Sequence, residues 1–341
     1  MATDIRGIAK HLGLSVSTVS KALNGYDSVS ETTRQRIMQV ARKYNYYPSR
    51  AARSLRSNKT EKVGLVLYTH TPLSNRSSEY YFEVIRGAAT TAESKGYNLV
   101  LYLTVGNQLD RLMNVCRSHE VDSLILMLGT GNMDEPVNLL IKEKIPFIVL
   151  NKHPRHLNVA YIVSDHEQGA KDAVEHLIKL GHRRIAYLGR EDDPETSGDR
   201  LAGYRRALSD HGFQIDDSLI AVASSQPLSA YRAMKQLLEQ PVRPTAVFAY
   251  SDAWAIEALH AISESGLQVP SDISLIGFDD LRTASAAIPP LTTVRQHLTE
   301  LGEQAIETLL QRVEDPPRFA IQRTIPVELI ERQSTAPPTS R

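Results

Sequence analysis

The chain has 341 residues, with 39 Lys and Arg against 39 Asp and Glu, so its formal net charge is zero. The charges are unevenly placed, because residues 1–62 carry twelve basic and four acidic side chains, a balance of +8, and the rest of the chain carries −8. A basic head on a larger acidic body indicates that only the head binds a polyanion. At roughly 150 residues per domain, the length predicts two or three domains.

The composition excludes several classes of protein. The single cysteine, Cys116, rules out an intramolecular disulfide framework and a cysteine-cluster zinc site. The N-terminus becomes polar within four residues and no apolar segment follows it, so we expect no secretory signal. The apolar runs 124–128 and 145–150 are too short to span a bilayer. We therefore expect a soluble, cytoplasmic protein that binds no membrane.

Three short amphipathic helices are predicted over the first 44 residues. Apolar residues at positions 5, 8, 9 and 12 predict a first helix with Thr3 as its N-cap, and Gly13 ends it. Gly7, inside this helix, weakens it by roughly 1 kcal/mol relative to Ala. We expect Ser15 to cap a second helix over residues 16–23, and a third to follow after Ser30. Two helices joined by a tight glycine turn are typical of a helix-turn-helix unit.

The second helix has the chemistry of a recognition helix. Its predicted outer face is short and hydrogen-bonding, with Ser17, Thr18, Ser20 and Lys21. Such a face suits the major groove of DNA, and the charge of the head suits phosphate binding by counterion release. A helix pair with a glycine turn also occurs in helical proteins that bind no DNA, so the pattern and the charge carry this prediction together.

Residues 50–56 form a short basic segment of good helix formers. Two interpretations stay open. In one, the segment becomes a helix on DNA and Leu55 inserts between base steps in the minor groove. In the other, the segment is a flexible basic linker and Leu55 packs on its neighbours.

From residue 63 onward, apolar strands alternate with amphipathic helices, which predicts βαβ units and parallel sheets. The strands form two comparable sets, which predicts two similar lobes. Ligands of such sheets bind beyond the carboxyl ends of the strands, where Asp252, Asp279 and Asp280 lie. The expected strands are 63–68, 98–103, 123–128, 146–150, 159–164, 184–188, 219–222, 246–250 and 273–277.

No catalytic motif appears at a recognisable spacing. The glycines at 129 and 131 lack the third glycine of a dinucleotide loop, and the chain has neither a Gly-x-Ser-x-Gly elbow nor a His-Glu-x-x-His pair. We therefore expect no enzyme, no catalytic residue, no metal site and no cofactor. A stand-alone solute-binding protein would share such a body, but it should carry an export signal and lack a basic helical head.

The chain resembles the LacI/GalR family of transcription regulators nearly from end to end. Residues 14–24 read LSVSTVSKALN, which is similar to the family's V-S-x-x-T-V-S-R-x-L-N, and residues 51–55 look like its hinge helix. In the body, residues 176–183 (HLIKLGHR), 270–280 (PSDISLIGFDD) and 290–294 (PLTTV) are typical of the family. Each motif is weak by itself, but the ordered set is highly specific.

The resemblance implies an α/β body of two lobes, each a parallel sheet flanked by helices, as in type I periplasmic binding proteins. Three crossovers would join the lobes, and the all-α helix-turn-helix head would precede them. The expected divisions are a head over 1–48, a hinge helix and linker over 49–62, a first lobe over 63–161 and 293–321, a second lobe over 162–292 and 322–333, and a tail over 334–341.

The resemblance also implies a homodimer whose heads bind a pseudo-palindromic operator. Val16 and Ser17 take the positions that largely set the operator sequence, and Lys21 takes a position that is usually Arg, which loses the bidentate fork for guanine. Leu55 would be the minor-groove wedge and Ala52 its packing partner, whereas Thr18 and Ser20 suit phosphates. The expected DNA-binding set is Ser15, Val16, Ser17, Thr18, Ser20, Lys21, Asn24, Ala52 and Leu55.

For a small effector, the resemblance implies a pocket arginine, Arg200, and a hydroxyl-binding aspartate, Asp279. An arginine flanked by carboxylates beside an aromatic face suits a polyhydroxylated ring. Ser225 replaces an aromatic residue of several relatives, which favours a sugar over a nucleobase. Alternatively, Arg200 and Asp279 form only an ion pair, and Tyr80 or Tyr81 belongs to the hydrophobic core instead of the effector site. The expected effector-binding set is Tyr80, Tyr81, Arg200, Ser225, Asp252 and Asp279.

We therefore predict a sequence-specific transcription repressor that leaves its operator when a small ligand, a sugar or glycoside, binds between the lobes. Two-state coupling between lobe angle and hinge order would link the two events. The alternatives are a corepressor-dependent repressor or an activator of the same fold, and a sugar-binding protein that does not bind DNA.

Overall fold

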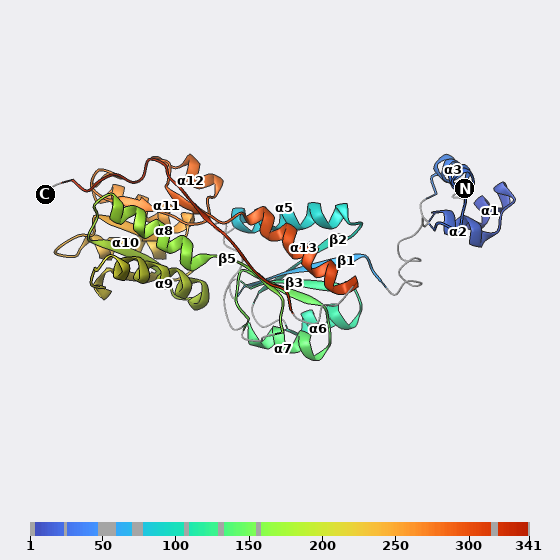
Figure 1. Ribbon diagram of the computed structural model, residues 1–341, viewed down its shortest axis with the longest axis horizontal. Coiled ribbons are helices and arrows are strands. Elements are labelled where there is room, and N and C mark those ends of the chain that lie inside the picture. Colours follow the sequence, from blue (N-terminus) through green and yellow to red (C-terminus); the bar gives the residue numbers. More distant parts are fainter. Residues whose placement is uncertain are drawn as a thin grey trace. The chain divides into compact units, whose positions relative to one another are not determined.

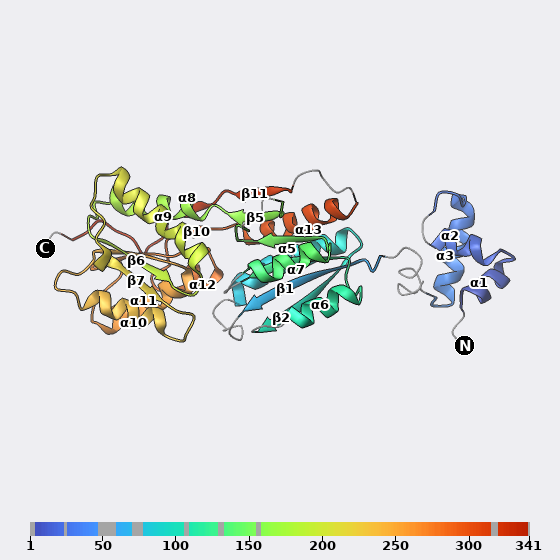
Figure 2. The same ribbon diagram turned by 90° about the horizontal axis from the view of Figure 1, so that it is seen from below.

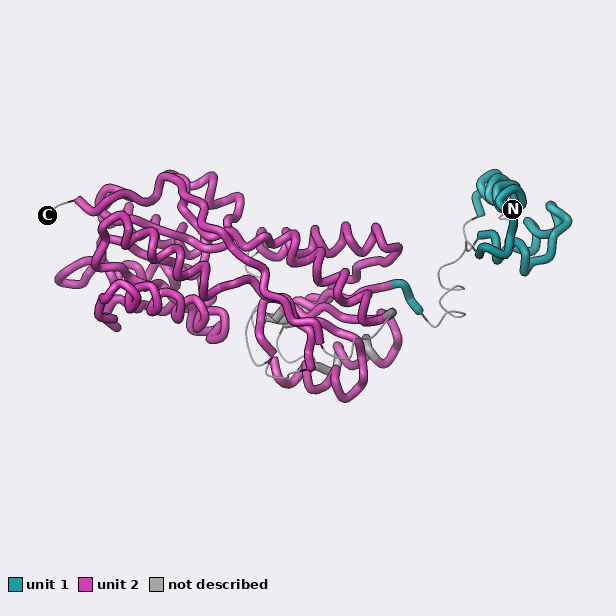
Figure 3. The backbone as a smooth tube through the Cα atoms, in the orientation of Figure 1, with its two compact units in different colours: residues 1–61 teal, residues 62–341 magenta. Residues whose placement is uncertain are grey.

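The computed structural model describes residues 4–23, 26–46, 59–69, 78–105, 109–128, 133–154, 158–314 and 320–339. The chain divides into two compact units, residues 1–61 and 62–341, which Figure 3 colours separately. The boundary follows the change from the basic helical head to the alternating strands and helices of the body. Among the described residues, no helix has the length and apolar character needed to cross a membrane.

The head contains the three expected helices, α1 (Ile5–Leu12), α2 (Val16–Leu23) and α3 (Glu31–Lys43). Asp4 rather than Thr3 caps α1, because the Asp4 carboxylate accepts a hydrogen bond from the Gly7 backbone N–H at 2.8 Å. Gly13 ends α1 with a φ of 64°, a left-handed conformation that glycine adopts without a steric penalty. The apolar stripes of the three helices meet in one core that includes Ile8, Val19 and Ile37.

The first sheet of the body contains six parallel strands in the order β11-β5-β4-β3-β1-β2. Helices α5 (Ser78–Ser94) and α13 (Leu298–Glu314) cover one face, and α6 (Leu109–Arg117) and α7 (Asp134–Lys142) cover the other (Figure 1). We call this sheet and its helices the first lobe. Its strands are β1 (Lys62–Thr69), β2 (Asn98–Val105), β3 (Ser123–Leu128), β4 (Phe147–Leu150), β5 (Tyr161–Ser164) and β11 (Gln322–Ile325).

The second lobe is built on four parallel strands in the order β7-β6-β8-β9. Helices α8 (His166–Lys179) and α9 (Pro194–Asp210) cover one face, and α10 (Ser229–Leu238) and α11 (Asp252–Glu264) cover the other (Figure 2). A short helix, α12 (Arg282–Ala286), follows the last strand. The strands are β6 (Ile185–Arg190), β7 (Ile220–Ala223), β8 (Ala246–Ala249) and β9 (Ser274–Ile276).

The chain changes lobe at slightly different points from those expected. Strands β5 and β11 pair with each other inside the first sheet, so the first lobe extends through residues 164 and 325. Strand β10 (Thr293–Arg295), which we expected in the first lobe, pairs with β12 (Glu328–Ile330) and packs on α8 of the second lobe.

The segment expected as a tail packs on the second lobe. The backbone N–H of Leu275 donates to the carbonyl of Ser334 at 2.8 Å, and the Ala336 N–H donates to the Ser274 hydroxyl at 3.0 Å. His182 also contacts the Ala336 carbonyl at 2.9 Å. Residues 334–336 therefore cover the open edge of β9, which leaves fewer unpaired backbone groups there.

Candidate DNA-binding and effector sites

Helix α2 presents three of the expected DNA-binding side chains to solvent. Val16 is 40% exposed although it is apolar, and Ser17 and Lys21 are exposed beside it. The Ser15 hydroxyl accepts from the Thr18 backbone N–H at 3.0 Å, which fixes the start of the helix, and contacts the Thr18 hydroxyl at 2.8 Å. The first turn of α2 therefore offers an apolar side chain and a hydroxyl side by side, as base-edge readout requires.

Ser20 does not lie on this outer face as predicted. It is only 9% exposed, within the three-helix unit. At about 100° per residue, Ser20 lies about 60° from Leu23 around the helix axis, which places it at the edge of the inward stripe. The other expected residues, Asn24, Ala52 and Leu55, lie outside the described residues.

In the body, the loop after β9 holds two aspartates in strained backbone conformations. Asp279 has a φ of 125° and Asp280 a φ of 57°, both in the region that disfavours side chains with a Cβ. The loop is held there because the Asp279 N–H donates to the Val294 carbonyl at 2.7 Å. The Asp280 carboxylate binds Arg295 at 2.7 Å and Arg332 at 2.5 Å. Strain of this kind concentrates at functional sites, where the surrounding structure maintains it.

Arg200 projects from α9 toward Asp279. Its guanidinium lies 3.7 Å from the Asp279 carboxylate, donates to the Tyr250 carbonyl, and contacts His166 Nδ1 at 3.4 Å. The guanidinium carbon also lies over the Phe278 ring, 3.8 Å from its centroid. Arg200 is 2% exposed, yet its Nε has no hydrogen-bond partner among the described residues. A buried donor without a partner costs free energy, so this atom indicates a place for a ligand acceptor.

The protonation of the neighbouring groups follows from burial. Burial raises the pKa of Asp279, although Arg200 and the Gln296 amide, which donates to Asp279 at 2.5 Å, act in the opposite direction. Burial and the adjacent Arg200 hold the pKa of His166 well below its usual value. A neutral His166 that accepts from Arg200 on Nδ1 carries its proton on Nε2 and donates it to the Asn151 amide oxygen at 3.1 Å.

Asn151, which follows β4 of the first lobe, extends this network to the expected tyrosines. Its amide nitrogen donates to the Tyr80 hydroxyl at 2.5 Å and to the Gln296 amide oxygen at 3.3 Å. Tyr80 contacts Tyr81 edge to face, with ring centroids 5.4 Å apart. The chain of contacts from Arg200 through Asn151 and Gln296 back to Asp279 is therefore closed, and it joins the two lobes.

Ser225 lies near a second arginine that the sequence did not single out. The Ser225 N–H donates to the Asp192 carboxylate at 3.0 Å, and the other oxygen of Asp192 binds Arg190 at 2.5 Å. The Arg190 guanidinium lies 5.7 Å from the centroid of the Tyr250 ring, on which Arg200 also lies at 4.5 Å. Arg190 is the last residue of β6 and Asp192 lies two residues beyond it. Their position at the carboxyl end of a predicted strand is the feature of the sequence that could have identified them.

Asp252 has a framework role instead of the expected place in the effector site. It is fully buried, and its two carboxylate oxygens accept from the Thr293 hydroxyl at 2.5 Å and from the Leu281 N–H at 2.8 Å. A Cβ at Gly277 would overlap this carboxylate, so the close approach requires glycine there. Asp252 therefore holds the strained loop that carries Asp279.

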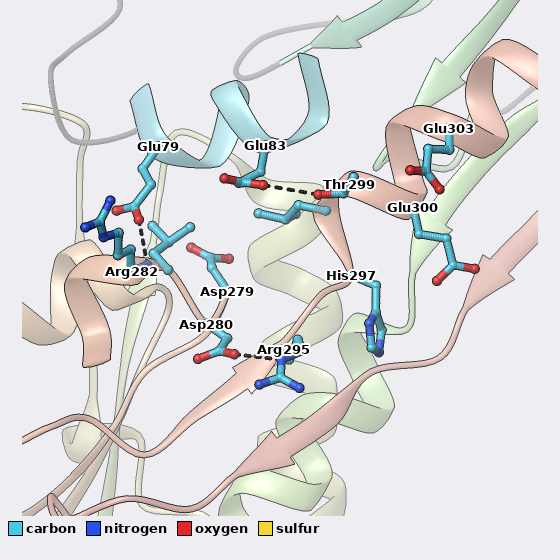
Figure 4. Close-up of a pocket in the computed structure, with 12 residues that line it drawn as sticks. Glu79, Glu83, Asp279, Asp280, Arg282, Arg295, His297, Thr299, Glu300 and Glu303 are labelled. Atoms are coloured by element: carbon cyan, nitrogen blue, oxygen red, sulfur yellow. Dashed lines mark hydrogen bonds and ion pairs between the residues drawn. The ribbon is translucent and has the colours of Figure 1, made fainter. Parts of the chain in front are cut away.

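A cavity of about 560 Å³ lies beside Asp279, between α5 of the first lobe and α12 of the second (Figure 4). Glu79 of α5 spans it, because its carboxylate accepts from the Arg282 N–H at 2.6 Å and from the Thr283 hydroxyl at 3.0 Å. Half of its lining residues are acidic, and the full lining comprises Glu79, Glu83, Asp279, Asp280, Leu281, Arg282, Arg295, His297, Leu298, Thr299, Glu300 and Glu303. Among the described residues, no cluster of His, Cys, Asp and Glu could hold a metal ion.

Comparison with known proteins gives two family matches. Residues 4–49 match the bacterial regulatory proteins of the lacI family, and residues 174–335 match a periplasmic binding protein-like domain. The chain is 34% identical to the HTH-type transcriptional repressor PurR of Escherichia coli O139:H28, over 98% of this chain and 97% of the relative. It is also 34% identical to the ribose operon repressor of Haemophilus influenzae, over 93% of each chain.

Solved structures give the same result for the fold. A lac repressor dimer bound to operator and the anti-inducer ONPF superposes with a TM-score of 0.83 at 26% identity, covering 98% of this chain and all of the other. A complex of the transcriptional regulator CelR with cellobiose superposes with a TM-score of 0.75 at 27% identity, covering 97% and 99%.

Proposed function

Because the chain belongs to the LacI family and is a DNA-binding transcriptional repressor, we propose that it acts as a homodimer on a pseudo-palindromic operator and is released by a neutral carbohydrate. In this proposal, Val16 and Ser17 contact base edges and Lys21 a guanine or phosphate. Thr18 positions the helix on the backbone, and Ser20 acts inside the head. The sugar binds at Arg200 and Asp279, and no chemical step is required.

The buried, unpartnered Nε of Arg200 is the observation that carries the effector site. The Nη2 nitrogen of the same guanidinium lies 3.7 Å from the carboxylate of Asp279, whose strained backbone is held by other parts of the second lobe. An arginine donor and a carboxylate acceptor a few ångströms apart bind adjacent donor and acceptor groups of a hydroxylated ring. Tyr80 and Tyr81 add an aromatic surface from the first lobe, so a ligand here contacts both lobes.

The charges of the surrounding side chains favour a neutral ligand. Arg190 is paired with Asp192 at 2.5 Å, and Lys152 with Asp193 at 2.9 Å, so neither cation is left to bind a phosphate. Ser225 offers no ring on which a nucleobase could stack. CelR was solved with cellobiose, and a LacI-family regulator from Enterococcus faecium, 26% identical with a TM-score of 0.70, was solved with ribose. These neighbours support a sugar or glycoside as the ligand class.

Thermal unfolding against a panel of neutral sugars, glycosides, sugar phosphates and nucleobases tests the proposal. A ligand at 100 times its Kd stabilises the folded chain by about 2.7 kcal/mol, which gives a clear rise in Tm. We expect a neutral sugar to give this rise and Arg200→Ala and Asp279→Ala to abolish it. Arg206→Ala is the matched control, because Arg206 lies on the same helix but is 59% exposed and binds Glu167 instead.

Two results would contradict this ligand class. A rise only with a sugar phosphate or nucleobase would replace the neutral sugar by that compound. A rise that persists in both Arg200→Ala and Asp279→Ala would place the ligand elsewhere in the body.

A further inference from the structure

The segment that follows β4 in the first lobe contacts the second lobe at three consecutive residues. Asn151 accepts from His166, Lys152 binds Asp193 at 2.9 Å, and the His153 N–H donates to the Glu195 carboxylate at 2.5 Å. Lys152 lies beyond the carboxyl end of β4 and Asp193 beyond the carboxyl end of β6. The two sheets therefore meet here through the residues that follow their strands.

The Lys152–Asp193 pair is withdrawn from water. The two side chains are 5% and 6% exposed, whereas the Arg206–Glu167 pair on the same face of the second lobe is 59% and 47% exposed. Removing water from two charges is costly, and the cost is offset only while both partners remain in contact. Removing one partner of such a pair therefore leaves the other charge buried without compensation, which is far more destabilising than losing one partner of an exposed pair.

The side chain of Asp193 binds Lys152 instead of capping its own helix. It occupies the N-cap position of α9, yet its side chain makes no capping hydrogen bond. Its carboxylate instead accepts from Lys152 and, on the other oxygen, from the Tyr250 hydroxyl at 2.9 Å. The backbone carbonyl of Tyr250 in turn accepts a hydrogen bond from the Arg200 guanidinium.

The same helix carries Arg200. Asp193 and Arg200 are seven residues apart, close to two turns of α9, so both lie on the same side of the helix. Lys152 therefore fixes, through Asp193 and Tyr250, the end of the element that presents Arg200 to a ligand. Lys152 itself is 4% exposed and is placed to act on the helix instead of on the ligand.

We propose that Lys152 and Asp193 form a latch that sets the spacing of the two lobes, and that Lys152 is a positioning residue for Arg200. When the latch is broken, the lobes separate and α9 loses its anchor on the first lobe. Any effect of the latch on sugar affinity rests on the proposed function, whereas its effect on the spacing of the lobes does not.

Spin-label distances in the full chain, without any added sugar, test the latch. In a Cys116→Ser background, Lys142→Cys on the first lobe and Arg243→Cys on the second give one labelled pair per chain. Both native residues are exposed. Labelled protein is diluted with an excess of unlabelled protein, so that each measured pair lies within one chain. Far-UV circular dichroism and Tm verify that every variant is folded.

The two halves of the latch should give unequal effects. Asp193→Asn leaves the Lys152 ammonium buried without its carboxylate, so we expect the distances to shift to a longer population. Lys152→Met leaves Asp193 with the Tyr250 hydroxyl, so we expect a smaller shift in the same direction. The double variant should return to the Lys152→Met distribution, because it no longer contains a buried unpaired ammonium.

Lys171→Met is the matched control. Lys171 binds Asp210 at 2.7 Å, but both residues belong to the second lobe, so its loss should leave the distances unchanged. The latch is overturned if Asp193→Asn and Lys152→Met give the wild-type distribution, if only one of them shifts it, or if Lys171→Met shifts it equally. None of these outcomes depends on whether the sugar panel succeeds.

Discussion

Burial sets the protonation of the side chains around Arg200. It raises the pKa of Asp279 and of Asp252, and it lowers the pKa of His166, because in each case the charged form loses its solvation. The Asp279 carboxylate also raises the pKa of Asp252. The result is one imidazole that stays neutral and two carboxyls that keep their protons to higher pH than exposed carboxyls do.

Asp279 should therefore make the folded body less stable as the pH rises. Its folded-state pKa lies above the unfolded value of about 3.9, so its contribution is complete below that value and is lost as the pH rises through the raised pKa. Asn cannot ionise and keeps the oxygen that accepts from Gln296. We expect Asp279→Asn to gain stability relative to the wild type with increasing pH, by at most about 1.4 kcal/mol per pH unit.

Chemical denaturation of both proteins from pH 4 to pH 8 measures this difference. His166 acts in the opposite direction, since its lowered pKa removes stability only as the pH falls below its unfolded value of about 6.5. His166 is common to both proteins, so the comparison cancels it. A difference that stays constant across this range would show that Asp279 is ionised throughout.

The residue scale is also where sequence reasoning was least complete. Arg200, Asp279 and Tyr80 lie in one network of polar contacts, and Tyr81 packs on Tyr80, whereas their role in ligand binding stays a prediction. Asp252 was misplaced because a carboxylate after a strand can either face a ligand or bind the next loop, and only the fold decides between them. The inter-lobe contacts of Asn151 and Lys152 depend on residues far away in the sequence, so no local sequence pattern predicts them.

At the scale of single elements, the two glycines of α1 should respond oppositely to the same change. Gly7 lies inside the helix and has no positive φ, so Gly7→Ala removes unfolded-chain freedom and should stabilise α1 by up to about 1 kcal/mol. Gly13 has a φ of 64°, so Gly13→Ala imposes a left-handed conformation on alanine and should cost about 1–2 kcal/mol. Amide hydrogen exchange of α1 in the full chain measures both changes. Equal signs for the two variants would contradict this account.

The contact between α5 and α13 gives a second prediction at this scale. A Cβ at Gly302 of α13 would overlap the carbonyl oxygen of Val84 on α5, and neither backbone can move without disturbing the first lobe. We expect Gly302→Ala to destabilise the body by about 1–3 kcal/mol. Gly198→Ala is the control, since a Cβ at Gly198 of α9 meets nothing within 4 Å. Thermal unfolding should show a fall in Tm for the first variant and none for the second.

The expected elements were largely confirmed because their patterns are long and periodic. All nine expected strands are present with bounds shifted by a few residues, and the second and third helices occur as predicted. Strands β10, β11 and β12 were not predicted, because they are not apolar throughout, unlike the equally short β4 and β8. Their pairing depends on crossovers whose positions only the assembled sheets determine.

At the scale of the whole molecule, the proposed function requires ligand binding in the acidic body to alter DNA binding by the basic head, although the two do not share a binding site. The proposed effector residues belong to the body, and the exposed face of α2 belongs to the head. A ligand alters operator affinity only if it binds the operator-competent and released states unequally. The network through Asn151 and the contact between Lys152 and Asp193 join the lobes around the proposed ligand residues, so lobe spacing is the variable through which such a difference would arise.

We therefore expect the sugar found in the panel to lower operator affinity, and the operator to lower sugar affinity by the same factor. Coupling free energies of about 1–3 kcal/mol correspond to factors of roughly 5 to 150. Operator titrations with and without sugar, and sugar titrations with and without operator, measure the two factors. All four are run at one salt concentration, because phosphate contacts make operator affinity strongly dependent on salt.

Lys21→Ala separates DNA binding from coupling in this experiment. Lys21 is an exposed residue of the head, so its loss should weaken operator binding while leaving the ratio of affinities with and without sugar unchanged. A sugar that tightens operator binding would reverse the sign and make the ligand a corepressor. Unequal factors in the two directions would mean that sugar and operator do not act on one shared equilibrium, because reciprocity holds for any pair of ligands linked in that way.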